Sequence, residues 1–191
     1  MTGVELGAGA AAGICRDCKT RDCCSSEVGL SGADVVRIAR TLQVNPEHFA
    51  ALAPMVGGAA HGSEQVRLGR SGVPHRLVLR RRETAPGRGD RVCTFLLELR
   101  GGRRLCGLAE LAPAACRLFP RDVDGGLHTG PGCWRAWTEE EAPRNEAATA
   151  VAIAERTRWH AVVATWNARV VEVEGEVDRA TFLAHLFTAY A

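Results

Sequence analysis

Eight cysteines are the residues of this chain whose type and spacing could do chemistry. Four of them lie within ten residues, in the stretch CRDCKTRDCC at positions 15–24, and the other four are spread over positions 93–133. Thiols in such numbers could form disulfides, ligate a metal, act as a redox pair or fill a hydrophobic core. The full set is Cys15, Cys18, Cys23, Cys24, Cys93, Cys106, Cys116 and Cys133.

The amino-terminal sequence MTGVELGAGAAAGIC bears on the redox state of these thiols. It contains Glu5, has no basic segment, and carries only small residues where the apolar core of a signal peptide would lie. No later stretch approaches the ~20 apolar residues of a membrane span. We therefore expect a cytoplasmic protein without a membrane partner. In a reducing compartment disulfides are rare, so a dense cysteine cluster is more often metal-binding or catalytic.

The spacing of the cysteines favours metal binding. A CxxC pair such as Cys15 and Cys18 lets the chain turn and direct both sulfurs at one ion. Cys23 and Cys24 differ, because consecutive side chains point to opposite sides in most backbone conformations. The eight thiolates would form two sites of four ligands, or one site with leftover structural thiols. Since neither group alone supplies a comfortable set of four, we expect the two groups to meet in space.

The choice of metal rests on the same spacing. Zinc sites commonly use two CxxC pairs, and this chain has one. Iron–sulfur clusters accept more scattered thiolates, which favours a [4Fe–4S] centre with zinc as the alternative. Arg16 and Arg117 each directly follow a cysteine, and Arg135 lies two residues after Cys133. Neighbouring guanidinium groups lower the pKa of a thiol. Ligation requires the thiolate, so these arginines support either metal.

The apolar pattern predicts the elements that must position the cysteines. We expect a helix over 31–42 with Ser31 as its N-cap, a second helix in NPEHFAAL, and a long helix from the capping box at Thr138. We also expect strands over 75–83 and 91–99, a short third strand ending at Cys106, a helical turn over 113–120 and a last helix near Asp178. The predicted class is α+β, with a small antiparallel sheet, flanking helices, metal-stapled irregular loops and a helical C-terminus.

The domain organisation follows from these elements. Residues 1–13 are rich in Gly and Ala and are expected to be poorly ordered. Residues 14–137 form the predicted cysteine-cluster metal-binding domain, and helices within 138–191 are expected to pack on the same domain.

The charge of the chain limits its partners. The formal net charge is only +2, so no nucleic-acid partner is expected. Six arginines lie between Arg76 and Arg91, interleaved with Glu83 and Asp90. They indicate either a solvated hairpin or a contact with an anion or a nucleic acid.

Several of these segments resemble a known family. The early cysteine cluster followed by VGLSGADVVRIARTL, then CTFLLE and CRLFP, is similar to the YkgJ-type cysteine-cluster proteins, over roughly residues 15–137. That family is described as a putative zinc- or iron-chelating domain with a CxxCxxCC motif, and the related flagellin lysine N-methylases are thought to hold an iron–sulfur centre. This chain has four residues before the cysteine pair, as in the methylase branch, and Ala112-Pro113 where the family has Arg-Pro.

Two classes of function fit these observations. The resemblance implies either a cluster-dependent enzyme that modifies a protein or peptide, or a structural or redox metal protein that acts through a protein or peptide partner. The chain is short for a self-contained methyltransferase and has no Rossmann-type glycine motif for S-adenosylmethionine. We therefore predict cysteine-ligated metal binding as the function, while the sequence leaves catalysis and the oligomeric state open.

Overall fold

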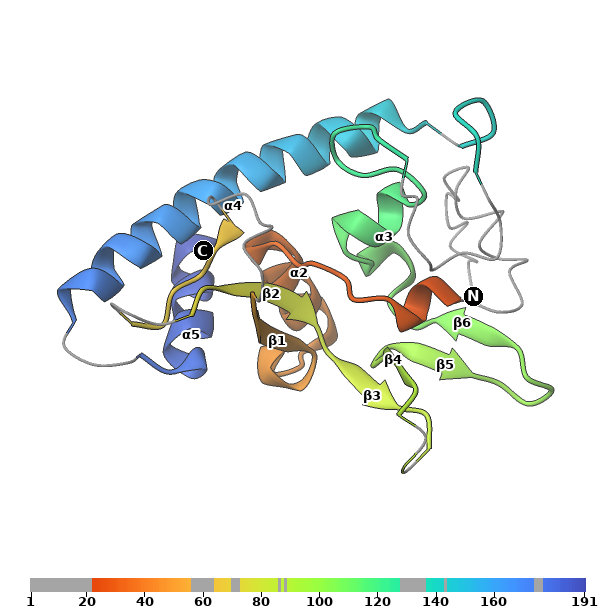
Figure 1. Cartoon of the computed structure of the whole chain (residues 1–191), viewed down its shortest axis with the longest axis horizontal. Coiled ribbons are helices and arrows are strands. Elements are labelled where there is room, and N and C mark those ends of the chain that lie inside the picture. The colour runs from red at the N-terminus through yellow and green to blue at the C-terminus, as the bar shows by residue number, and fades with distance from the viewer. Residues whose placement is uncertain are drawn as a thin grey trace, which may run out of the picture.

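Helices and short antiparallel hairpins alternate along the chain in a computed structural model (Figure 1). The structure describes residues 22–55, 64–69, 73–85, 87, 89–127, 137–142, 144–173 and 177–191. The predicted α+β class, with small antiparallel sheets and a helical C-terminus, is confirmed. The predicted disorder of residues 1–13 concerns a segment outside the described residues.

Helical elements make up the larger share of the described chain. The α-helices are α2 (Gly32–Leu42), α3 (Ala114–Leu118), α4 (Glu146–Glu172) and α5 (Arg179–Ala189). The short 3₁₀ turns are η1 (Asp22–Ser25), η2 (Pro46–His48) and η4 (Ala109–Leu111). Helix α4 extends along one side of the molecule, with α2, α5 and α3 packed against it (Figure 1).

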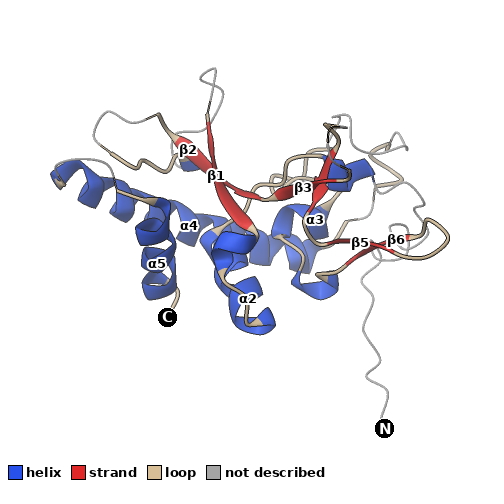
Figure 2. Cartoon of the chain, turned by 90° about the horizontal axis from the view of Figure 1, so that it is seen from below, coloured by secondary structure: helices blue, strands red, loops and turns tan. Residues whose placement is uncertain are grey.

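The strands pair into three two-stranded antiparallel sheets within the described residues. Their bounds are β1 (Ala50–Pro54), β2 (His75–Leu79), β3 (Arg81–Glu83), β4 (Arg91–Cys93), β5 (Leu96–Glu98) and β6 (Arg104–Cys106). β1 pairs with β2, β3 with β4, and β5 with β6. Strands β3–β6 lie at the end of the molecule away from α5 (Figures 1 and 2).

The predicted single sheet is wrong in its connectivity, because each long strand changes partner halfway. The segment 75–83 pairs with β1 until Leu79, and then the Arg80 N–H donates to the Phe49 carbonyl at 2.6 Å. The Thr94 N–H in turn donates to the Arg80 carbonyl at 3.1 Å, and this bond starts the pairing of β3 with β4. The segment 91–99 turns in the same way at Thr94, so β4 and β5 belong to different hairpins.

Two predicted helices are only partly correct. In NPEHFAAL the Asn45 side chain accepts the Glu47 N–H at 2.9 Å, but η2 ends after His48 and the chain enters β1. Pairing with β2 buries Ala50, and this tertiary contact overrides local helix propensity. Thr138 Oγ1 accepts the Glu141 N–H at 3.3 Å, yet that turn does not continue into a helix.

Helix α4 therefore begins later than Thr138. The Asn145 side chain accepts the Ala148 N–H at 3.0 Å, and the helix starts at Glu146. The proline at position 143 has no N–H to donate, so it cannot extend the turn that begins at Thr138.

The helices at 32–42 and 179–189 form as predicted because each has its N-cap. Ser31 accepts the Asp34 N–H at 3.1 Å, while the Asp34 carboxylate accepts the Ser31 N–H at 3.0 Å, which completes a capping box. Asp178 accepts the Thr181 N–H at 2.7 Å at the start of α5. The predicted helical turn over 113–120 is α3.

The hydrophobic core lies where α2, α4 and α5 meet. The stripe predicted on the long helix is buried there, since Trp159, Val163 and Trp166 are each at most 4% exposed. Phe182 of α5 is fully buried and meets the Trp166 ring edge-on, with 5.1 Å between ring centroids. Cys93 and Cys106 are partly buried against the same cluster, and α4 contacts the cysteine-bearing helix α3.

Within the described residues, none of the helices combines the length and the apolar character that crossing a membrane requires.

Candidate metal centre

Five of the eight predicted ligands lie within the described residues. Cys23 and Cys24 are on η1, Cys93 ends β4, Cys106 ends β6, and Cys116 is in the middle of α3. All five are thiols rather than disulfides. Cys15, Cys18 and Cys133 are outside the described residues.

The cysteines of the early and the late group lie together. η1 contacts β4, and the Arg81 guanidinium of β3 donates to the Ser25 carbonyl at 3.0 Å. The ionisation of Cys24 is opposed by the charges of Cys23, Cys93 and Cys106. That of Cys116 is likewise opposed by the charges of Cys106, Cys93 and Cys23. Two chain segments about 70 residues apart therefore bring their thiols to one place.

The side chains within the described residues do not form a complete set of metal ligands. Across the described ranges, no three His, Cys, Asp or Glu side chains are placed to hold one ion. The donor chemistry itself fits, because thiolates are the ligands that zinc and iron–sulfur clusters prefer. Three further candidate ligands lie outside the described ranges, so the five thiols are one part of the predicted set.

Cys93 has the most developed local environment. The chain turns immediately after it, and the Phe95 N–H donates to the Cys93 sulfur at 3.4 Å. A second backbone bond from Leu96 and the charge of Arg82 also favour the Cys93 thiolate, although burial is the larger effect and raises its pKa. Such donors around a sulfur orient it and stabilise its charge in metal sites. The Phe95 ring packs on Phe49, which anchors this turn to the core.

Cys106 is fixed by the hairpin that it ends. It lies opposite Leu96 in the β5–β6 register, one turn after Cys93. The next residue, Gly107, donates its N–H to the Phe95 carbonyl at 2.8 Å. A Cβ at position 107 would lie 2.9 Å from that carbonyl oxygen, so only glycine fits the approach without a shift. This contact links the Cys93 turn with the end of β6.

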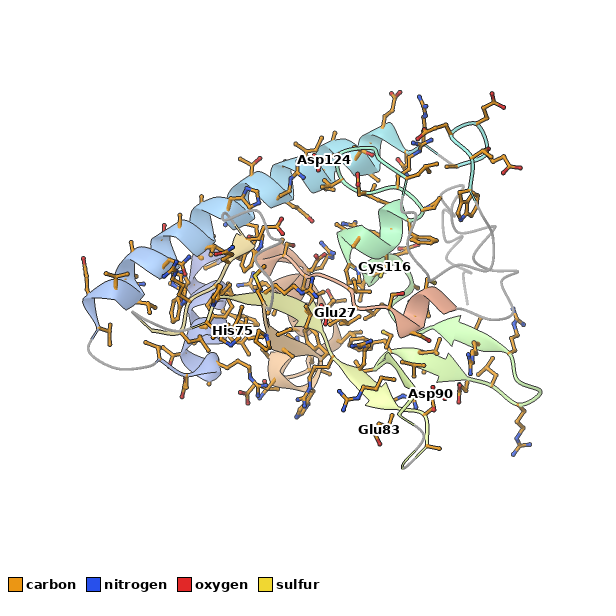
Figure 3. The ribbon with its side chains drawn as sticks, in the orientation of Figure 1. Glu27, His75, Glu83, Asp90, Cys116 and Asp124 are labelled. Atoms are coloured by element: carbon orange, nitrogen blue, oxygen red, sulfur yellow. The ribbon has the colours of Figure 1, made fainter. Side chains whose placement is uncertain are left out.

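Cys116 is held by a partly buried ion-pair network that is centred on Asp34. Asp34, only 2% exposed, accepts the Ala114 N–H at the start of α3 at 3.2 Å and pairs with Arg37 at 2.5 Å. Arg37 also contacts Glu155 of α4 at 3.2 Å, and Glu155 lies 3.7 Å from Arg117. The short cysteine-bearing helix is thus tied to both α2 and α4. Figure 3 shows Cys116 on α3, below the first turns of α4.

The environment of three thiols disfavours their ionisation. The pKa of Cys24 is raised by its hydrogen bond with Cys23, by burial and by the charges of neighbouring cysteines. The expectation that Cys23 and Cys24 point to opposite sides is therefore wrong, because the 3₁₀ turn brings their thiols together. Burial likewise raises the pKa of Cys93 and of Cys116. The Cys116 residue has surface open to solvent, but protein atoms crowd its sulfur and desolvate it. A bound cation reverses this preference, because it stabilises the thiolates and releases their protons.

The arginines act differently from the sequence prediction. The guanidinium that favours the Cys93 thiolate is that of Arg82, which is eleven residues from Cys93 in the sequence. Arg117, directly after Cys116, lies near Glu155, and Arg16 and Arg135 are outside the described residues. The role of Asp34 in holding α3 was also missed. Its capping box is visible in the sequence, but no local pattern connects it to a residue 80 positions later.

Comparison of the chain with protein-family models, with curated proteins and with solved structures found no match. The resemblance to the YkgJ-type proteins therefore stays a prediction that rests on the quoted motifs.

Proposed function

We propose that this chain is a cysteine-ligated metal-binding protein whose centre is an iron–sulfur cluster, with zinc as the second candidate. The observation that supports the proposal best is the convergence of thiols from four separate elements. η1, β4, β6 and α3 supply them, and their charges oppose one another's ionisation. Thiols that are packed together only as small hydrophobic groups do not require backbone donors, whereas Cys93 has them.

The scatter of the ligands favours a cluster over a single ion. Two cysteines come from one 3₁₀ turn, and three more come from separate elements further along the chain. A cluster has several metal atoms and accepts thiolates that approach from different directions. Zinc takes four ligands in a tetrahedron, and one CxxC pair at 15–18 remains a suitable half of such a site.

The experiment that tests this proposal is metal analysis of the full chain purified without oxygen. We expect bound iron and acid-labile sulfide, with visible absorbance that disappears on oxidation. Zinc has a filled d shell and gives no such absorbance, so its presence alone would assign the second candidate. A folded protein with neither metal would overturn the proposal.

Single substitutions then test the ligands. Cys93→Ser and Cys106→Ser should each lower the bound metal per chain, because each removes a sulfur from the group. Ser25→Ala is the matched control, since Ser25 directly follows the cysteine pair and is exposed. Its carbonyl still accepts from Arg81 after the change. Equal metal content in the control and in both cysteine variants would show that these thiols are not ligands.

A further inference from the structure

The β5–β6 hairpin has an inner face toward the core and an unusual outer face. The antiparallel register places Leu96 opposite Cys106 and Leu97 opposite Leu105, and successive side chains alternate between faces. Leu96 is buried, whereas Leu97 is 49% exposed and Leu99 is 44% exposed. The solvent face of an antiparallel hairpin is normally polar. Leu97 on β5 and Leu99 directly after it therefore leave two leucines exposed on one side of the hairpin.

Unneutralised arginines border these leucines. Arg103 lies across from Leu99, whose N–H donates to the Arg103 carbonyl at 2.8 Å, and Arg100 begins the turn of the hairpin. Both arginines are exposed, and no carboxylate of the described ranges lies within ion-pairing distance of either. We call the surface formed by Leu97, Leu99, Arg100 and Arg103 the hairpin face. It combines apolar area with positive charge.

The neighbouring hairpin adds to this positive charge. Arg80, Arg81 and Arg82 are exposed, and each guanidinium donates to a backbone carbonyl of another segment at 2.8–3.0 Å. These bonds fix the side chains without neutralising them. Over residues 80–104 the sequence contains eight arginines and three acidic residues, a net charge of +5, against +2 for the whole chain. This end of the molecule therefore attracts negatively charged partners.

We propose that the hairpin face binds an extended protein segment in which carboxylates alternate with apolar side chains. The carboxylates would meet Arg100 and Arg103, and the apolar side chains would cover Leu97 and Leu99. The edge of β5 adds little to this recognition. Leu99 and Phe95 bond to the β6 side of the hairpin, and the Leu96 carbonyl already accepts Arg82 at 3.0 Å, so Glu98 is the residue of β5 whose backbone is directed outward and free to pair. The side chains of the hairpin face therefore carry most of the contact.

Two other partner classes fit this surface less well. Single-stranded nucleic acids bind through aromatic side chains on which bases stack, and the hairpin face has none. A membrane surface requires a larger apolar area than two leucines provide. The inference goes beyond metal binding and does not depend on it. Because the hairpin ends at Cys106, the bound segment would lie beside the thiols.

The test uses the full chain as purified without oxygen and a fluorescein-labelled synthetic peptide in which glutamate alternates with leucine. Fluorescence anisotropy should show binding that weakens as salt is added. The double variant Arg100→Glu with Arg103→Glu should bind roughly tenfold more weakly or worse, because like charges then face each other. Leu97→Ser with Leu99→Ser should also weaken binding. Arg144→Glu, at an exposed arginine just before α4, is the matched control and should bind as the wild type does.

Four outcomes would overturn the inference. They are no binding by the wild type, unchanged binding by the arginine variant, equal binding of a peptide with glutamine in place of glutamate, and tighter binding of single-stranded RNA or phosphatidylserine vesicles than of the peptide. Metal content is measured for every variant. A variant that keeps its metal but loses the peptide separates this inference from the proposed function.

Discussion

The helical half of the molecule and its cysteine-bearing half are stabilised in different ways. In the first, α2, α4 and α5 bury a continuous set of large apolar side chains, including Trp159, Trp166 and Phe182. In the second, β3–β6 and α3 are short elements with few buried residues, and their thiols are partly accessible. Hydrophobic burial therefore accounts for the stability of the helical half. The stability of the cysteine-bearing half relies on specific polar contacts and, in our proposal, on a bound metal.

Metal removal should give the largest effect on stability, and it should destabilise the cysteine-bearing half much more than the helical half. A structural zinc supplies on the order of 10 kcal/mol of binding free energy, which is otherwise missing from a region with little apolar burial. We expect chelation of the full chain to speed amide hydrogen exchange in β4–β6 and α3 by orders of magnitude. Residues 159–170 of α4 should change little. A uniform increase over the whole chain would show that the halves unfold as one unit.

Phe182→Ala should produce the opposite pattern. Phe182 is fully buried between Trp159 and Trp166, so its truncation leaves a cavity and should lower the free energy of unfolding by about 3–5 kcal/mol. Chemical denaturation measures this loss, and metal content at low temperature should stay at the wild-type level. Val171 on α4 is 44% exposed, so Val171→Ala is the control. Its free energy of unfolding should stay within about 0.5 kcal/mol of the wild-type value. Loss of metal in the folded Phe182 variant would contradict the separation.

Asp34→Asn tests the connection between the halves. Asp34 accepts hydrogen bonds from Ser31, Arg37 and the first residue of α3, and asparagine keeps the shape but loses the charge. We expect a loss of about 2 kcal/mol in the free energy of unfolding, since hydrogen bonds to charged groups are worth about 1.5–3 kcal/mol each. The rate of amide hydrogen exchange in α3 should also rise in this variant. Glu110→Gln, at an exposed residue, is the control, and equal effects of the two changes would show that the Asp34 network does not stabilise α3.

Gly107→Ala should act within the cysteine-bearing half alone. The added Cβ would lie 2.9 Å from the Phe95 carbonyl, so β5 or the Cys93 turn must shift, at a cost of about 1–3 kcal/mol. Metal content should fall because Cys93 and Cys106 flank this contact. Gly29→Ala, where an added Cβ meets nothing within 4 Å, should leave both stability and metal unchanged. Wild-type metal content in the Gly107 variant would mean that the turn tolerates the displacement.

The smallest expected effect is a pH dependence of the helical half. Burial and the charge of Arg169 lower the pKa of His185, which lies against Trp166 between α4 and α5. The folded state therefore favours the neutral ring. This contribution to stability is complete above the ordinary histidine pKa of ~6.5 and is lost as the pH falls through the lower folded value. Urea unfolding across this range should show a smaller decline for His185→Gln than for the wild type. Identical profiles would exclude His185 as the cause.

The halves also differ in how well the sequence predicts them. The helical stripe of Trp159, Val163 and Trp166 and the N-caps Ser31 and Asp178 are local patterns, and the structure contains all of them. The partner changes at Arg80 and Thr94 depend on hydrogen bonds to distant segments, so periodicity predicted longer strands than exist. The α+β class and the positions of the short turns could be predicted from the sequence.

The candidate site was predictable only at the level of residue type. Cysteine density and spacing identify the thiols, because these are properties of the chain itself. Two other features depend on the tertiary structure. Arg82 lies near the Cys93 thiol, and Asp34 holds the start of α3. The predicted arginines were instead those next to or near a cysteine in the chain, because closeness along the chain is the only proximity that a sequence displays.

The separation of the two cysteine groups along the chain has a consequence for synthesis. Sixty-eight residues lie between Cys24 and Cys93. Translation at 5–20 residues per second adds this stretch in roughly 3–14 s. During that interval the first four thiols have been synthesised and move out of the ribosome while their later partners do not yet exist. The nascent chain therefore exposes an incomplete set of thiols to oxidants and to free metal ions. The number of residues between the two cysteine groups sets how long this exposure lasts.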